Sequence, residues 1–594
     1  MYNPTLLGEI VSVAGSSILI ELTKQVDSGL VVLQGRTYKV GQVGSFIRIP
    51  QGFNDLFGII SETSEHKISS VEDIQEEKRL IKVELVGESV NNAFERGIGQ
   101  YPNINDEAHF VTETDLRKIY GEKSEGQIHI GSLSSSESIK VSLDLNLLVN
   151  RHSAVLGSTG SGKSTSVSSL LRSIAADEDD SIIRPSSRVI LFDIHGEYSS
   201  ALKDISIVFS INPVNDEFPL YIPYWCVNPE KLIEFLCGSN ESLRNRFIDL
   251  LLEQKKAFVK KHMPNLAPEK ITPHTPIPFY LNRIWYDLCH EDSVTWKEKE
   301  QINENYIDKG NMEDLIPPSF VPPCTKNDAL SVKGGNNNWK RYLTQFRSRL
   351  IDSQYDFFLK PGDWSVDKDL NTNKDLDLLL SDWLSHNQPI TILDLSGMPS
   401  ARLDLLLGSA LDILFEAAVW GRFQQSGMKE KPLLLVLEEA HRYLSNDSDG
   451  LAKDMIRRIA KEGRKFGVGS MLVSQRPSEI DETILSQCGT LIALRMTNSS
   501  DRSKVKSVMA DSLTGIVDSL PILRTGEAVI TGEAIKLPMR CKFRTPKEGR
   551  FPDSRDPDIT SKWVKDFNQD NFSDLIHGWR NQSPVRPNKE DDHG

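Results

Sequence analysis

The segment from Ala154 to Thr165 has the residue types and spacing of a phosphate-binding loop. Three apolar residues predict a buried strand, and Gly157, four spacers and Gly162-Lys163-Ser164 then fit G-x-x-x-x-G-K-[ST]. Glycine lets backbone N–H groups turn towards phosphate oxygens, and the helix that follows presents its positive N-terminus to them. A chance glycine-rich turn is the alternative. We predict that a nucleotide contacts Gly157, Ser158, Thr159, Gly160, Ser161, Gly162, Lys163, Ser164 and Thr165.

Two acidic residues follow an apolar strand later in the chain. Leu433 to Leu437 are all apolar and run directly into Glu438 and Glu439. The carboxyl end of a buried strand is where α/β sheets bind ligands. Next to Lys163, which would reach the β- and γ-phosphates, and Ser164, which would hold Mg²⁺, we assign Glu438 to the outer shell of the metal. Glu439 is assigned to the attacking water. The alternative is a helix N-terminus that carries favourable acids.

Two further strand ends carry polar residues. The strand Gly469 to Ser474 is followed by Gln475, whose neutral amide could bridge the γ-phosphate and the water. A polar strand cap is the alternative. The strand Arg188 to Asp193 leads into Asp193-Ile194-His195-Gly196-Glu197, where we predict that Asp193 and Glu197 position the nucleotide or the water. Structural hydrogen bonding is the competing interpretation for these two acids.

Two arginines lie where they cannot easily serve their own phosphate site. Arg151 precedes the strand of the phosphate-binding loop, and Arg464 follows the helix after the two glutamates. In an ordinary sheet both would face a neighbouring subunit, and an arginine supplied by a neighbour can accelerate phosphoryl transfer by ~10³–10⁵. Surface salt bridges are the alternative for both.

The elements that must position these residues alternate between strands and helices. This alternation predicts an α/β fold with right-handed crossovers and a mostly parallel sheet. Short alternating strands near the N-terminus, separated by Gly, Pro and Asn, predict a small β-barrel in preference to an irregular extension. Further expected elements are strands at Pro389 to Ser396, Thr490 to Arg495 and Gly526 to Gly532, and helices at Leu243 to Lys261, Ala401 to Phe423 and Ser561 to Asn568.

The 594 residues are enough for several domains. We divide the chain into a β-barrel (1–90), a linker or β extension (91–145), the first part of the ATPase core (146–222), a largely helical insertion (223–388), the second part of the core (389–545) and a partly disordered C-terminal extension (546–594).

Charge, cysteine content and hydropathy indicate which partners and which cellular compartment the sequence favours. The net charge of −14 argues against a generally basic nucleic-acid coat but does not exclude a local basic channel. Six dispersed cysteines without a C-x-x-C pair favour a reducing cytoplasm over a zinc cluster or a disulfide framework. No signal peptide and no uncharged apolar stretch of about 18 residues is evident. We therefore expect a soluble cytoplasmic enzyme without a membrane partner.

Taken in order, five motifs resemble those of the HerA family, within the HerA/FtsK group of ring-shaped P-loop ATPases. They are L-G-S-T-G-S-G-K-S, F-D-I-H-G-E-Y, L-E-E-A-H-R-Y, R-I-A-K-E-G-R-K-F-G-V-G and V-S-Q-R-P-S-E-I, and the β-rich N-terminus is similar to the family's HAS-barrel. The resemblance implies a RecA-like core and a homohexamer that threads double-stranded DNA through a central pore, with ATP between subunits.

Residue by residue, the resemblance gives Glu439 the role of catalytic carboxylate and Gln475 that of sensor. It makes Arg151 and Arg464 similar to the family's trans-acting arginines. The chain departs from many P-loop enzymes in having Glu438 where they have Asp. The helical block 223–388 is a larger departure, which leaves the pore contacts unassigned.

Family members act with a partner, so the resemblance also implies a nuclease or sirtuin-like effector that docks on the barrel, in anti-phage defence or DNA-end processing. No L-S-G-G-Q helix or long heptad pattern supports an ABC-type or SMC-like ATPase. The alternative function is a nucleotide-switched hexameric scaffold that activates a toxic effector with little translocation.

Overall fold

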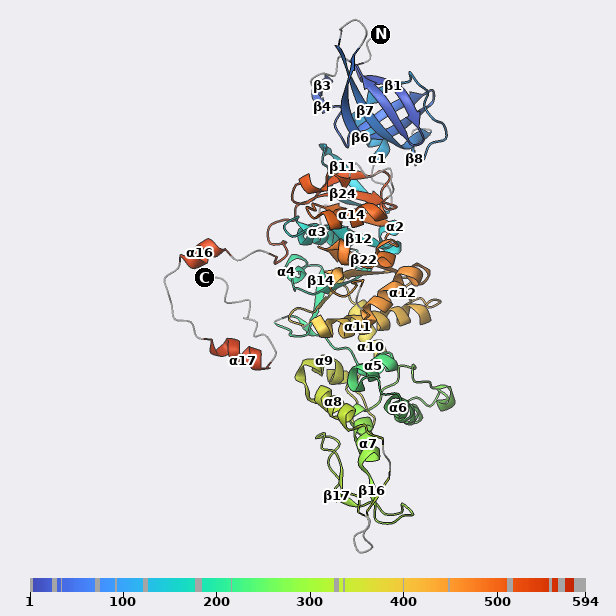
Figure 1. Cartoon of the computed structure of the whole chain (residues 1–594), viewed down its shortest axis with the longest axis vertical. Helices are drawn as coiled ribbons and strands as arrows, with labels where there is room; N and C mark the ends of the chain where they lie inside the picture. Colours follow the sequence, from blue (N-terminus) through green and yellow to red (C-terminus); the bar gives the residue numbers. More distant parts are fainter. Residues whose placement is uncertain are drawn as a thin grey trace.

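The computed structural model describes residues 4–23, 29–33, 35–69, 75–90, 93–120, 126–176, 184–214, 216–324, 331–334, 337–398, 400–446, 449–509, 517–554, 558–564 and 572–581. Three parts lie along one long axis (Figure 1). An N-terminal barrel lies at one end, a large sheet with helices lies in the middle, and a mainly helical part lies at the other end. No helix among these residues is both long and apolar enough to cross a bilayer.

The N-terminal strands of the described chain form a closed barrel of six strands, in the order β2-β1-β9-β5-β6-β7, with β2 also paired to β7. Every second residue faces the interior, so that Ile18, Ile20, Ile81 and Val83 are buried. The predicted barrel is thus confirmed, and its strand β9 comes from the segment expected to be a linker or β extension. The strands are β1 (Leu6–Ala14), β2 (Ser17–Leu22), β5 (Phe46–Gln51), β6 (Asn54–Ser69), β7 (Gln75–Val90) and β9 (Glu107–Phe110).

Two smaller features accompany the barrel. The strand β8 (Ala93–Arg96) pairs with β7 and extends the barrel sheet towards the rest of the molecule. The strands β3 (Leu30–Leu33) and β4 (Arg36–Lys39) form a separate hairpin. Helix α1 (Glu113–Tyr120) follows the barrel and leads the chain into the central sheet (Figure 1).

The central sheet has twelve strands within the described residues, in the order β11-β10-β25-β24-β23-β12-β22-β21-β13-β20-β14-β15. The block from β23 to β15 is parallel, and the strands from β11 to β24 form an antiparallel extension, so the predicted mostly parallel sheet is confirmed. The bounds are β10 (Gln127–Leu133), β11 (Ser136–Asp144), β12 (Ser153–Leu156), β13 (Arg188–Asp193), β14 (Ser206–Ser210), β15 (Phe218–Pro219), β20 (Ile390–Asp394), β21 (Leu433–Leu437), β22 (Val468–Ser474), β23 (Thr490–Leu494), β24 (Glu527–Gly532) and β25 (Met539–Phe543).

Helices cover both faces of this sheet, which explains why its strands are apolar throughout. Val155 belongs to the core shared with α3 (Lys163–Ala175), whereas its neighbours Ala154 and Leu156 belong to the core shared with α11 (Ser400–Trp420) and α12 (Leu451–Phe466). A strand buried on both faces reads as a continuous apolar run instead of an alternating one. Helix α2 (Leu145–Asn150), capped by Asp144, leads into β12.

Residues between β15 and β20 form the mainly helical part. The predicted helix Leu243 to Lys261 lies within α6 (Glu241–His262), whose N-cap Asn240 accepts a hydrogen bond from the backbone N–H of Leu243. The buried Trp285 donates from its indole to the carbonyl of Leu343 and ties two helices together. The other elements are α5 (Pro229–Cys237), α7 (Leu281–Ser293), β16 (Thr295–Trp296), β17 (Tyr306–Asp308), β18 (Ser319–Phe320), β19 (Val332–Lys333), α8 (Lys340–Ile351), α9 (Asp356–Leu359) and α10 (Leu376–Leu384).

The remaining helices connect strands of the central sheet or belong to the C-terminal tail. The connecting helices are α4 (Tyr198–Ala201), α13 (Glu482–Leu485) and α14 (Ser499–Val508). The helices of the tail are α16 (Ile559–Trp563) and α17 (Ser573–Asn581). The helix predicted at Ser561 to Asn568 overlaps the end of α16, and its residues from 565 onwards lie outside the described ranges.

Candidate nucleotide site

The predicted nucleotide-binding residues meet at one edge of the parallel sheet. Strand β12, which leads into the glycine-rich loop, lies between β22 and β23, and β21 and β13 follow on the far side of β22. Since these strands are parallel, their carboxyl ends share one edge. This topology brings the loop, Glu438, Glu439, Gln475 and Asp193 together from four separate segments of the chain.

The glycine-rich loop needs glycine for two distinct reasons. Gly162 has φ +84°, and a Cβ there would lie 2.9 Å from the backbone nitrogen of Gly526. Gly157 has no room either, because a Cβ would lie 2.8 Å from the Cβ of Leu494. The loop is held from outside by Arg495, whose carbonyl accepts from the N–H and hydroxyl of Ser158 and whose guanidinium donates to the carbonyl of Gly160 at 2.6 Å.

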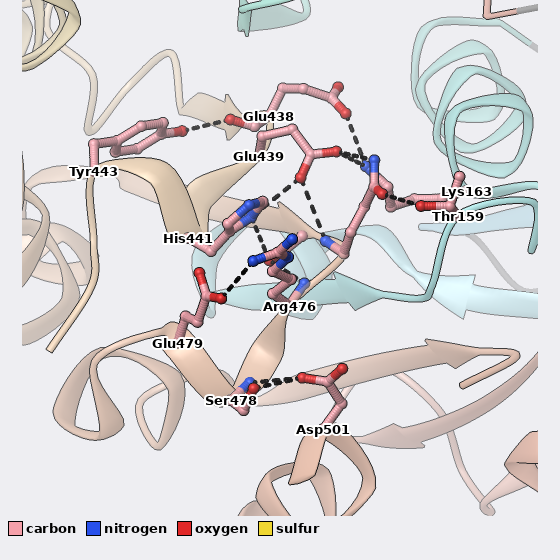
Figure 2. A network of polar contacts seen from close by, with 12 residues as sticks. Thr159, Lys163, Glu438, Glu439, His441, Tyr443, Arg476, Ser478, Glu479 and Asp501 are labelled. Carbon is pink, nitrogen blue, oxygen red and sulfur yellow. Dashed lines mark hydrogen bonds and ion pairs between the residues drawn. The ribbon is translucent and has the colours of Figure 1, made fainter. Parts of the chain in front are cut away.

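Lys163 connects the loop to both glutamates. Its Nζ lies 3.0 Å from Oε1 of Glu438 and 2.7 Å from Oε1 of Glu439. Figure 2 shows both carboxylates directed towards Lys163. All three side chains are buried, with exposed fractions of 5% or less. Burial alone would lower the pKa of Lys163, but the two carboxylates outweigh it and raise the pKa, so the ammonium is charged.

Glu438 is the more deeply buried of the two acids. Burial raises its pKa despite the charge of Lys163. Its main-chain carbonyl accepts a hydrogen bond of 2.8 Å from the Tyr443 hydroxyl. Its Oε2 atom is buried beside Tyr198 and has no hydrogen-bond partner of good geometry within the described residues. A buried carboxylate oxygen without a partner is a group that a cation or its water could satisfy.

Glu439 is held in place by three neighbours. Gln475 donates from Nε2 to Oε1 at 2.5 Å. Nδ1 of His441 lies 3.1 Å from Oε2, and Figure 2 shows the two side chains pointing towards each other. Burial would raise the pKa of Glu439, but His441, Lys163 and Gln475 together lower it to about 2. The carboxylate is therefore ionised at neutral pH and accepts hydrogen bonds only.

The backbone of Glu439 is also unusual. Its φ of +45° and ψ of +46° are in the left-handed region, which costs a residue with a side chain about 1–3 kcal/mol. This turn follows β21 directly and is continued by a 3₁₀ turn, Ala440–Arg442. The left-handed conformation places Glu439 and Glu438 side by side against Lys163, an arrangement that two successive residues of a strand could not reach.

Gln475 links the glycine-rich loop to Glu439. Its amide oxygen accepts a hydrogen bond of 2.6 Å from the Thr159 hydroxyl, while its amide nitrogen donates to Glu439. Both the oxygen and the nitrogen of the Gln475 side-chain amide therefore have a hydrogen-bond partner. A single side chain thus joins Thr159 of the loop to Glu439.

Asp193 and Glu197 take different positions. The Asp193 carboxylate accepts from the backbone N–H groups of His195, Gly196 and Tyr198, so its oxygens serve the local turn. Burial and the charge of Glu438 raise its pKa to about 7. Glu197 is half-buried at the start of α4. These contacts favour the structural interpretation for Asp193, and its predicted role towards nucleotide or water stays a prediction, as does that of Glu197.

The two arginines lie at the opposite, amino edge of the sheet. Arg151 precedes β12, and its Nε is 3.3 Å from Oε2 of Glu533. Arg464 is exposed in the last turn of α12, and its guanidinium makes no hydrogen bond or ion pair within the described residues. His152, the residue after Arg151, lies close to Gly463, the residue before Arg464. The two arginines are therefore near each other at this edge of the sheet. Neither arginine belongs to the phosphate site of its own chain.

Two residues of the site were not assigned from the sequence. His441 contacts Glu439 and also lies 3.2 Å from the Ser474 hydroxyl, and Arg495 holds the glycine-rich loop. For Arg495 a usable signal exists, because it is a polar residue at the end of a strand that neighbours the loop strand. For His441 the only signal is its position two residues after Glu439, which does not reveal the turn between them.

The side chains present fit a magnesium ion bound together with a nucleotide. Mg²⁺ prefers oxygen ligands and takes one or two carboxylates together with substrate phosphates. Ser164, half-buried in the first turn of α3, and the buried Oε2 of Glu438 beside Tyr198 could supply such oxygen atoms. No cluster of three or more His, Cys, Asp or Glu side chains that could hold a metal by itself occurs in the described ranges.

Comparison with known proteins agrees with the five motifs. Residues 128–412 match the family model for the central domain of helicase HerA, and residues 407–538 match the model for the HerA-like C-terminal region. The DNA double-strand break repair helicase HerA of Pyrococcus furiosus is 26% identical over 557 residues, which are 89% of this chain and 88% of that protein. The corresponding helicase of Sulfurisphaera tokodaii is 29% identical over 77% of this chain and 76% of its own length.

Solved structures with a related arrangement are more distant. VirB4 of Thermoanaerobacter pseudethanolicus is 14% identical with a TM-score of 0.44, over 72% of this chain and 98% of VirB4. The bacterial conjugative coupling protein TrwB is 12% identical with a TM-score of 0.42, over 75% of this chain and 94% of TrwB. On the matched domain models and relatives, and on the closed barrel and P-loop sheet described above, this chain belongs to the HerA family of helicase-related P-loop ATPases.

Proposed function

We propose that this chain hydrolyses ATP as a homohexameric ring and uses the energy to move along double-stranded DNA held in a central pore. The observation that carries the proposal is the split of the site: Lys163, Glu439 and Gln475 lie at one edge of the sheet, and Arg151 and Arg464 lie at the other. Arginines at the amino edge can complete a phosphate site only on a second copy. The relatives' description as DNA repair helicases supports DNA as the polymer.

Each side chain of the site has a separate role in the proposed hydrolysis of ATP. Lys163 binds the β- and γ-phosphate oxygens, and in doing so exchanges its contacts with Glu438 and Glu439 for the phosphates. The ionised carboxylate of Glu439 accepts a hydrogen bond from water and aims it at the γ-phosphorus. Gln475 keeps that carboxylate oriented. When bound between Ser164 and Glu438, Mg²⁺ would neutralise charge that develops on the phosphates.

We also propose a nuclease or sirtuin-like effector partner on the barrel, in anti-phage defence or DNA-end processing. Two loops of the barrel support a docking surface. Gln51 donates to Asp106 at 2.5 Å, which joins the turn that carries the exposed Phe53 to the segment that carries the exposed Tyr101 and Ile104. Six unpaired cysteines support a cytoplasmic location. Purification with the product of an adjacent reading frame tests the partner: wild-type protein should retain it and Phe53→Asp should lose it, whereas equal retention would place the partner elsewhere.

One set of ATPase assays tests the function. Linear duplex DNA is expected to raise wild-type turnover, and Glu439→Gln should bind ATP normally while kcat falls by roughly 10²–10⁴, because the water loses its carboxylate. Glu462→Gln, an exposed glutamate on α12, is the matched control. Turnover that depends on the partner but not on DNA would instead support a nucleotide-switched scaffold, and wild-type kcat in Glu439→Gln would remove the assigned carboxylate.

A further inference from the structure

One side chain of the barrel extension holds a turn of the ATPase core. The guanidinium of Arg96, at the end of β8, donates to the carbonyl of Lys536 at 2.8 Å and to the carbonyls of Gly532 and Ile535. Gly532 is the last residue of β24, and Ile535 and Lys536 belong to the turn between β24 and β25. A planar fork of N–H donors can serve several carbonyls at fixed geometry, which an ammonium group does less well.

The same turn carries the partner of Arg151. Oε2 of Glu533 lies 3.3 Å from Nε of Arg151, and the Glu533 charge also acts on Arg96. Within the described residues Glu533 is the only ion-pair partner of Arg151. An ion pair with one carboxylate restrains where the guanidinium lies, and its five N–H donors leave it able to contact a second anion.

The core fixes the turn from the other side. The N–H of Glu533 donates to the carbonyl of Gly489 at 2.7 Å, and Gly532 has φ +119° with no room for a Cβ. Arg96 lines two cavities, of about 340 and 300 Å³, between the barrel extension and the core. Phe57 and Phe94 also share one apolar cluster with Ala534 and Ile535 of the turn, so the hydrogen bonds of Arg96 add directional contacts to apolar packing between barrel and turn.

We propose that Glu533 and the barrel residue Arg96 are positioning residues for Arg151, so that the orientation of the barrel sets how Arg151 reaches the phosphate site of the neighbouring subunit. The inference rests on the proposed trans role of Arg151. It adds a chain of contacts, from Arg96 through the turn to Glu533, that links the barrel to Arg151. A protein bound to the barrel would change the rate of ATP hydrolysis through this route, without touching the nucleotide.

The test measures kcat and KM for ATP, with duplex DNA, in the full-length chain. Glu533→Gln and Arg96→Lys should each lower kcat about five- to twentyfold at unchanged KM, because a misplaced arginine loses its effect on the reaction and not on ATP binding. Combined with Arg151→Ala, neither should lower kcat further, since residues acting through one group are not additive. Glu137→Gln and Arg117→Lys, which alter exposed ion pairs elsewhere, are controls expected to keep wild-type kcat.

The two proposals fail in different ways. Unchanged kcat in Arg151→Ala would overturn the trans role itself. A slow Arg151→Ala protein together with wild-type kcat in Glu533→Gln and Arg96→Lys, or with additive losses, would overturn the positioning inference alone. Glu533→Asp separates positioning from folding, because it keeps the charge one methylene away and should give an intermediate kcat at an unchanged melting temperature; wild-type or fully lost turnover would count against positioning.

Discussion

At the scale of single residues, the site depends on what fixes the carboxylate of Glu439. Lys163 is expected to move to the phosphates, so His441 and Gln475 must then hold Glu439 without it. A hydrogen bond to a charged group contributes about 1.5–3 kcal/mol when it is lost from a buried site. Nδ1 of His441 lies 3.1 Å from Oε2 of Glu439 and 3.2 Å from the Ser474 hydroxyl, so this ring nitrogen faces both groups.

His441→Ala should therefore lower kcat about ten- to hundredfold and leave ATP binding unchanged, because the water-orienting carboxylate loses one of its supports. Steady-state kinetics with a separate nucleotide-binding measurement checks this. His274→Ala, at an exposed histidine of the helical part, is the matched control and should behave as wild type. A raised KM with unchanged kcat would mean that His441 serves the nucleotide and not Glu439.

At the scale of elements, residue patterns predicted most of the central sheet. The predicted strand Leu433 to Leu437 is β21 without change, and the predicted helix Ala401 to Phe423 corresponds to α11. These succeeded because a strand covered on both faces and a long buried helix each leave a strong apolar signal. The glycine-rich loop likewise lies between a strand, β12, and a helix, α3, as its motif predicted.

Other features depend on partners far apart in the chain. The pairing of Gly131 with Phe543 joins β10 to β25, and β9 closes a barrel whose other strands lie before residue 90. No local pattern specifies such pairings. The contact of His441 with Glu439 was missed for a related reason. It requires Glu439 to adopt a left-handed backbone conformation, which the sequence L-E-E-A-H does not predict.

The junction of β12 with α12 leads to a prediction about pH. His152 is buried, its Nδ1 lies 2.9 Å from the Ser470 hydroxyl, and burial lowers its pKa from 6.5 to about 4. The folded protein thus prefers the neutral ring. This stability is fully present above pH 6.5 and is lost as pH falls towards 4, by about 3 kcal/mol at most.

Urea unfolding monitored between pH 7.5 and pH 4.5 checks the prediction. The free energy of unfolding of the wild-type core should fall more steeply with acid than that of His152→Asn, which cannot take up the proton. Both proteins carry the same carboxylates, so the difference between the two curves isolates the imidazole. Parallel curves would show that His152 is already protonated, or exposed, in the folded protein.

At the scale of the whole molecule, the separation of the two sheet edges implies that a complete site spans two chains. On the proposed function, Lys163→Ala would remove the phosphate contact of its own site, and Arg464→Ala would remove a contact with the next site. Mixing these two inactive proteins during assembly should restore activity, because about a quarter of the seams in a random ring then pair an intact Lys163 with an intact Arg464.

The matched control for this mixture is Lys163→Ala with Glu439→Ala. Those two residues act within one chain, where Nζ and Oε1 lie 2.7 Å apart, so no combination of the two variants rebuilds a whole site and no activity should return. ATP turnover measured across mixing ratios distinguishes the cases, since restored activity should peak near equal proportions. Failure of the Arg464 mixture at every ratio, while both proteins still assemble, would mean that Arg464 does not act across the seam.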